Sequence, residues 1–141
     1  MPYVVGVGLA LGVGLFATFL GLDRDRAFYP TVTIVVASYY ALFAVMGESA
    51  AALGRESTVI LLFVLAAGVG FKRSLWVVAV ALCAHGVFDF LHAGLIENPG
   101  VPGWWPPFCG AYDVTAGAYL AVLLSRSKAA SPPAPTHRAV P

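Results

Sequence analysis

The stretch "YVVGVGLALGVGLFATFLGL" (Tyr3–Leu22) contains no charged side chain. A helix of about 20 apolar residues is long enough to cross the hydrocarbon core of a bilayer. A cleaved signal peptide would instead have positive residues before the apolar core and a small-x-small cleavage site after it. Neither is present. The stretch is therefore predicted to be a retained transmembrane helix, whose Gly8 and Gly12 would pack against another helix.

The rest of the chain has the same apolar character. Of its 141 residues, 60% are hydrophobic and 11% are charged, whereas soluble domains carry about 25% charged residues. The composition therefore indicates a membrane protein. The net charge is +1 and no basic patch is interleaved with aromatics, so we expect no nucleic-acid partner. The spacing of Cys83 and Cys109 does not match a CxxC motif, so no disulfide framework is expected.

Four more apolar spans follow the first, separated by polar turns that include "GRES" at Gly54–Ser57. They are Thr31–Leu53, Thr58–Phe71, Ser74–Ile96 and Pro106–Leu124. Each is predicted to be a transmembrane helix. The fold class is therefore all-α, a five-helix transmembrane bundle within residues 1–125. Residues 126–141 are polar and rich in proline, and are predicted to form a disordered tail.

The distribution of lysine and arginine predicts the orientation, because cytoplasmic loops carry an excess of both. Seven of the eight would lie on one side of the membrane: Arg24, Arg26, Lys72, Arg73, Arg126, Lys128 and Arg138. Only Arg55 would lie on the other side. We therefore expect the N-terminus outside and the C-terminus in the cytoplasm, in a multi-pass protein of a bacterial plasma (inner) membrane.

The fourth span carries three ionisable groups within the segment "ALCAHGVFDFLHAGLIE" (Ala81–Glu97). His85, Asp89 and His92 stand at positions i, i+4 and i+7, so they form one stripe along a helix. A charged group facing lipid costs about 2.5–3.5 kcal/mol on insertion scales. The stripe is therefore predicted to face the interior of the bundle.

Two other spans bring acidic groups to a similar depth. From a rise of about 1.5 Å per residue, Glu48 falls about 8 Å below the outer end of the second span, and Asp113 about 12 Å below the outer end of the fifth. Cys109 lies one turn above Asp113 on the same face and is either a ligand or a small packing residue. We expect Glu48, His85, Asp89, His92 and Asp113 to form one site in the outer leaflet.

Three carboxylates in a low dielectric repel one another and lose hydration, so something must compensate them. A divalent metal would do so, and imidazole with carboxylate suits zinc, iron or manganese, of which zinc is favoured. The predicted ligands are His85, Asp89, His92 and Asp113, with Asp113 and Glu48 as candidate catalytic groups. Protonation is the alternative, giving an acid–base pair or a proton relay. A purely structural polar network is a third possibility.

The motifs His85-x3-Asp89-x2-His92 and Cys109-x3-Asp113, joined by a proline-rich loop, resemble a pattern in small bacterial integral membrane proteins. The chain is also similar, more loosely, to intramembrane metal hydrolases of the alkaline ceramidase type. The second resemblance implies a histidine-rich zinc site with an acidic residue inside a helical bundle. This chain has only two histidines inside its predicted spans, and Ser38 and Ser49 are not clear counterparts of the family's serine.

The function expected first is a metal-dependent enzyme that acts on a lipidic or apolar substrate among the membrane lipids. A cation or proton transporter or channel, working as a homo-oligomer, is the second hypothesis. A metal-free isomerase or cyclase is the third. The predicted cytoplasmic half is almost entirely apolar, which favours a one-sided pocket over a pore. The loop at 98–107 would be a lid, a rim or a plain connection.

Overall fold

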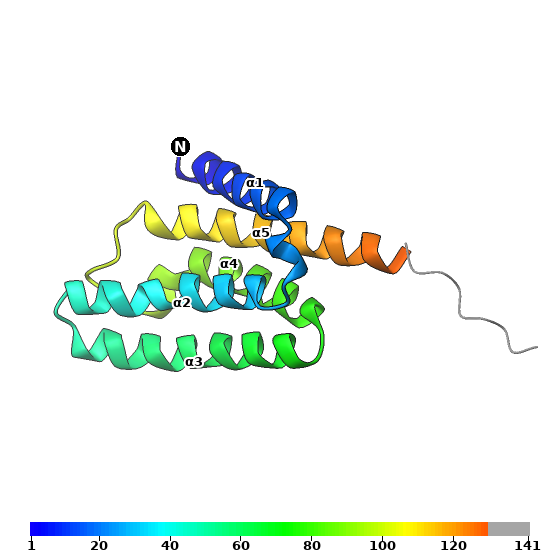
Figure 1. Ribbon diagram of the computed structural model, residues 1–141. Helices are drawn as coiled ribbons and strands as arrows, with labels where there is room; N and C mark the ends of the chain where they lie inside the picture. Colours follow the sequence, from blue (N-terminus) through cyan, green and yellow to red (C-terminus); the bar gives the residue numbers. More distant parts are fainter. Residues whose placement is uncertain (130–141) are drawn as a thin grey trace, which may run out of the picture.

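The computed structural model describes residues 1–129, which form five long helices and no strand (Figure 1). All five are long and apolar enough to cross a membrane, so the chain is a multi-pass membrane protein. This confirms the predicted all-α bundle of five membrane-spanning helices. A short 3-10 helix, η1, covers Leu22–Arg24. The long helices are α1 (Pro2–Leu20), α2 (Phe28–Met46), α3 (Ala50–Lys72), α4 (Leu75–Leu95) and α5 (Trp105–Ala129).

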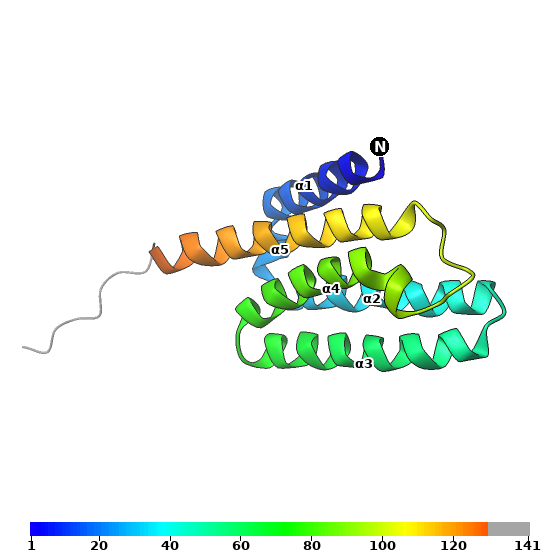
Figure 2. The same ribbon diagram turned by 180° about the vertical axis from the view of Figure 1, so that it is seen from behind.

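The helices alternate in direction, and α1 and α3 lie at opposite edges of the bundle (Figures 1 and 2). α5 packs against α1 on one side and α4 on the other, while α3 packs against α2 and α4. One end of the bundle holds Met1 and the loops 47–49 and 96–104, and we call it the Met1 end. The other end, called the Arg26 end, holds residues 21–27 and the 73–74 turn.

The third helix begins earlier than its sequence suggested. Ser49 caps it, since the Ser49 hydroxyl accepts a hydrogen bond from the Ala52 amide at 3.2 Å. The prediction of a turn at Gly54–Ser57 is therefore wrong, because these residues lie inside α3. Arg55 and Ser57 are exposed, but Glu56 is buried. The polar appearance of "GRES" thus reflects the outer face of a helix, and its glutamate enters the bundle.

Glycines allow α4 and α5 to come unusually close. A Cβ atom on Gly86 would lie 2.7 Å from the Gly110 carbonyl oxygen, and one on Gly117 would lie 2.8 Å from the Ala79 oxygen. Both distances are too short for any residue with a side chain to fit without a shift. This close approach places the polar side chains of the two helices within contact distance.

On α1 the contact glycines differ from those predicted. Gly6 and Gly14 face α5, where an added Cβ would clash with the Phe108 carbonyl and with the Tyr119 ring respectively. A Cβ atom added at Gly8 or Gly12 would meet no other described residue outside its own helix turn within 4 Å. The buried stripe of α1 is Gly6, Ala10, Gly14 and Ala17, so the small residues that pack are spaced by three and four but start two positions earlier than expected.

At the C-terminal end, α5 continues to Ala129, four residues beyond the predicted boundary at 125. The remainder of the predicted disordered tail, 130–141, lies outside the described residues.

Candidate functional site

Four buried side chains meet where α4 and α5 touch, and we call them the His85 group. His85 and Asp89 come from α4, and Cys109 and Asp113 from α5. Each is at most 2% exposed. One potential ligand atom from each residue lies within 4.8 Å of those of the other three, so the group could hold a metal ion.

His85 sits between the two carboxyl groups. Its Nδ1 lies 2.7 Å from Asp113 Oδ2 and 3.5 Å from Asp89 Oδ2. The Cys109 thiol points to the same Asp113 oxygen, with Sγ at 3.6 Å. A proton on Nδ1 therefore donates to Asp113, whose Oδ2 is also the acceptor for the Cys109 thiol.

Local sequence explains why these side chains meet. Each helix contributes two residues at i and i+4, which lie on one face of an α-helix. The helices run in opposite directions, so the Met1-end member of one pair, Asp89, faces the Met1-end member of the other, Cys109. Gly86 and Gly110 adjoin the pairs and permit the contact between the backbones.

A second buried cluster, called the His92 group, lies nearer the Met1 end. His92 Nε2 is 2.8 Å from Glu56 Oε1, and both side chains are nearly inaccessible. Asn98, from the loop after α4, donates from Nδ2 to Glu56 Oε1 at 2.9 Å and to the Tyr40 carbonyl at 3.1 Å. These two hydrogen bonds attach the loop to α2 and α3 beside His92.

Tyr40 joins the two groups. Its ring stacks on the His92 ring with centroids 4.1 Å apart. Its hydroxyl donates a hydrogen bond of 2.6 Å to Asp89 Oδ1. Tyr40 is 1% exposed, so it is a buried residue that orients one carboxylate of the His85 group and packs against the His92 group.

The structure divides the predicted site. His85, Asp89 and Asp113 come together as expected, and Cys109 joins them. His92 does not, because seven residues along a helix separate it from His85 by about 10 Å along the axis, and it pairs with Glu56 instead.

Glu48 lies outside the bundle interior. The prediction that it lies within the second span is wrong, because α2 ends at Met46. Glu48 occupies the α2–α3 loop with φ 51° and is exposed. The predicted span ran to Leu53 only because the alanines after Ser49 continue the apolar pattern.

Two residues of the site were missed. Glu56 carried a usable signal, because Ala52, Glu56, Phe63, Ala67 and Gly70 are spaced as one face of a helix that begins at Ser49. Asn98 carried none, since an asparagine in a proline-rich loop is typical of turns.

Three buried carboxylate oxygens have no hydrogen-bond partner within residues 1–129: Asp89 Oδ2, Asp113 Oδ1 and Glu56 Oε2. An ionised oxygen buried without a partner is costly, so it needs a cation or a proton. Two of the three belong to the His85 group, where the imidazole and the thiol supply further ligand atoms.

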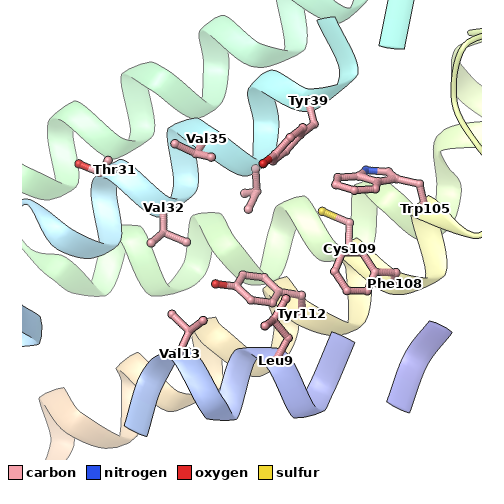
Figure 3. Close-up of a pocket in the computed structure, with 11 residues that line it drawn as sticks. Leu9, Val13, Thr31, Val32, Val35, Tyr39, Trp105, Phe108, Cys109 and Tyr112 are labelled. Atoms are coloured by element: carbon pink, nitrogen blue, oxygen red, sulfur yellow. The ribbon is translucent and has the colours of Figure 1, made fainter. Parts of the chain in front are cut away.

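An apolar cavity of about 400 Å³ lies between α1, α2 and α5 and reaches Cys109 (Figure 3). In this view the Cys109 side chain extends into the space between α2 and α5, beside Trp105. The same cysteine therefore belongs both to the His85 group and to the cavity wall. The lining consists of Leu9, Val13, Thr31, Val32, Val35, Val36, Tyr39, Trp105, Phe108, Cys109 and Tyr112.

Comparison with known proteins finds no family model, no curated protein and no solved structure that matches this chain. The two resemblances drawn from the sequence motifs therefore stay predictions, and the function must be argued from the site.

Proposed function

We propose that this protein is a metal-dependent membrane enzyme whose metal is held by His85, Asp89, Cys109 and Asp113. The observation that supports this most directly is the His85 group itself, with four potential ligand atoms within 4.8 Å of one another and all four side chains buried. Its two carboxylates and one imidazole leave an excess of negative charge when ionised, and a divalent cation would compensate it.

The distances suit a small divalent ion. Zinc binds nitrogen and oxygen at about 2.0–2.2 Å and sulfur at about 2.3 Å, so ligand atoms of a tetrahedral site stand roughly 3.3–3.8 Å apart. The separations of Asp89 and Cys109 from their neighbours, 3.5 and 3.6 Å, lie in that range. The 2.7 Å contact between His85 and Asp113 would lengthen when the shared proton leaves. Sulfur favours zinc over manganese, with iron between them.

A bound ion would supply Lewis-acid chemistry, either polarising a carbonyl oxygen of the substrate or favouring ionisation of a bound water. The chain's own residues would hold and orient the site. Tyr40 fixes Asp89 through its 2.6 Å hydrogen bond. His85 and Asp113, whose ligand atoms lie 2.7 Å apart, would both hold the ion once the proton between them has left. Trp105 and Phe108, beside Cys109 in the cavity wall, would limit the access of water.

The substrate would be lipidic or apolar, because the space beside Cys109 is lined mainly by aliphatic and aromatic side chains. We place the protein in a bacterial plasma membrane with Met1 outside, on the strength of the lysine and arginine distribution. Membrane lipids would be its immediate partners.

A metal-free acid–base enzyme, an isomerase or cyclase, is the second candidate. The close pairs His85–Asp113 and Tyr40–Asp89 support it, because in each a side chain able to carry a proton lies within a short hydrogen bond of a buried carboxylate. In that case one carboxyl stays protonated and acts as an acid while its neighbour acts as a base.

Elemental analysis of the full chain, purified without chelator, tests the proposal. We expect about one divalent metal per chain, lost in Asp113→Asn and retained in the matched control Glu48→Gln, because Glu48 is exposed on a loop. Chains that fold but hold no metal, even after zinc is added, would overturn it and favour the metal-free candidate. Ion flux in proteoliposomes that Asp89→Asn abolishes would instead support transport, by the chain or by a homo-oligomer.

A further inference from the structure

The cavity beside Cys109 opens on the side of the bundle. Two residues of its rim, Leu9 on α1 and Val35 on α2, are each 48% exposed. Both lie near the midpoint of a 19-residue helix that is apolar enough to span a membrane. A 19-residue helix is about 28 Å long, close to the hydrocarbon thickness of a bilayer of about 30 Å. The opening therefore faces the acyl chains rather than water.

Access from the Met1 end is closed. Asn98 ties the loop after α4 to Glu56 and to the Tyr40 carbonyl. Gly100 packs so tightly on the Phe43 carbonyl that a Cβ atom would not fit. The Trp105 ring closes this end of the cavity, because its centroid lies 4.9 Å from the centroid of the Tyr39 ring and 4.9 Å from that of the Phe43 ring. The Met1 end therefore offers no route to Cys109, whereas the side of the bundle does.

The cavity is lined mainly by apolar side chains, with polar atoms near both of its ends. It follows α2 from Thr31 to Tyr39, about 12 Å along the helix axis. Cys109, Tyr39 and Trp105 lie toward the Met1 end, and Val13, Val32 and Val35 lie farther along. A molecule with a long apolar tail fits this lining, and if it carries a carbonyl group, that group would lie beside Cys109, where the proposed metal site adjoins the cavity. The volume of the cavity, about 400 Å³, lies within the range of roughly 300–1,000 Å³ for small-molecule pockets.

We propose that this cavity binds one acyl chain of a membrane phospholipid, which enters between α1 and α2 with its carbonyl end beside Cys109 and its tail toward Thr31. The proposal rests on the proposed function, for which it names the substrate class and the route of access. Phospholipid is the source we choose because its acyl chains already fill the membrane at the depth of the opening. The headgroup stays outside the rim, since the lining has no charged side chain.

Photo-crosslinking of the full chain in phospholipid bilayers tests this. Two phospholipid probes carry a diazirine, one near the acyl carbonyl and one near the terminal methyl. We expect the first to label the peptide around Phe108–Tyr112 and the second the peptide around Thr31–Val36. Labelling should exceed that of the lipid-facing α3 segment Leu61–Leu65 by about fivefold, since a specific site must compete with bulk lipid.

A matched pair of variants controls for general lipid contact. Val35→Trp fills the cavity and should remove the excess labelling. Leu42→Trp changes a residue of the same helix that is 50% exposed but does not line the cavity, and it should leave the excess intact. Labelling no stronger at the cavity than on α3 would overturn the proposal. So would labelling weaker than on α3 together with crosslinked dimers, which would mean that a second copy covers the opening.

Metal content separates this proposal from the one on which it rests. Val35→Trp should keep its metal while it loses the excess labelling. Asp113→Asn should lose its metal while it keeps the labelling. Metal binding without selective labelling would leave the proposed function standing and remove the acyl-chain site. Selective labelling in a chain that never binds metal would leave the acyl-chain site standing and overturn the proposed metal-dependent function.

Discussion

The His85 and His92 groups contain the same kind of pair in different settings. Each places a buried histidine of α4 against a carboxylate of another helix, at 2.7 and 2.8 Å. The His85 pair has a second carboxylate, a thiol and an adjoining cavity. The His92 pair has instead the Asn98 amide, which attaches the loop after α4 to Glu56, and the ring of Tyr40 stacked on His92. The His85 pair is the better candidate site because a second carboxylate, a thiol and a cavity adjoin it, whereas the His92 pair has one spare carboxylate oxygen and no cavity beside it in the part of the chain described.

The largest expected effect is on the His92 group. Glu56→Ala removes the partner of His92 and of Asn98, which leaves a buried imidazole unpaired. We expect the free energy of unfolding to fall by about 3–5 kcal/mol, measured by thermal or denaturant unfolding in a fixed detergent. Metal content per folded chain should not change. A loss of metal at unaltered stability would mean that the His92 group is part of the metal site.

Next in size is the contrast between the two histidines. His85→Ala should weaken metal binding by more than about 100-fold, because removing a direct ligand costs more than the 10–100-fold typical of supporting residues. His92→Ala should leave the metal affinity within a few-fold of the unchanged chain. Competition with a chromogenic chelator measures both. Equal losses in the two variants would contradict the division of the site.

A smaller effect is expected for the residue that joins the groups. Tyr40→Phe keeps the ring that stacks on His92 but loses the hydrogen bond to Asp89 Oδ1. We expect metal affinity to fall by about 10–100-fold, as for other residues that orient a ligand. The free energy of unfolding should fall by about 1–3 kcal/mol, because the buried Asp89 Oδ1 loses its donor. Tyr39→Phe is the control, since Tyr39 makes ring contacts only with Phe43 and Trp105 among the described residues. Unchanged affinity in Tyr40→Phe would show that Asp89 does not bind the metal through this arrangement.

The smallest effect concerns the residue that the sequence placed in the site and the structure does not. Glu48→Gln alters an exposed loop side chain, and such changes stay within about 0.5 kcal/mol. We expect no measurable change in unfolding or in metal content. A clear loss of metal would return Glu48 to the site and contradict the loop placement.

Much of the fold could be read from the sequence, because apolar spans and charged loops are local properties. The stripe of His85 and Asp89 and its meeting with Asp113 followed from helical spacing and from the cost of charge in lipid. The choice between Glu48 and Glu56 did not, because it depends on whether a helix begins before or after a polar run. A single cap at Ser49 decides that.

The separation of His92 from His85 could have been read from the sequence, because seven residues along a helix span about 10 Å. The role of Cys109 could not, because it depends on how closely α4 approaches α5, which glycines at distant positions determine together. Spacing along one helix limits which residues share a face, but the distance between faces is a property of the assembled pair.

That distance has a consequence for the range of ions the centre could accept. Where backbones touch, as at Gly86 and Gly110, the separation of opposing ligands cannot shrink and can grow only if the helices part. Gly86 and Gly110 would therefore limit the size of the cation that the site accepts. Adding one methyl group at either glycine, with every ligand retained, should shift preference toward larger cations.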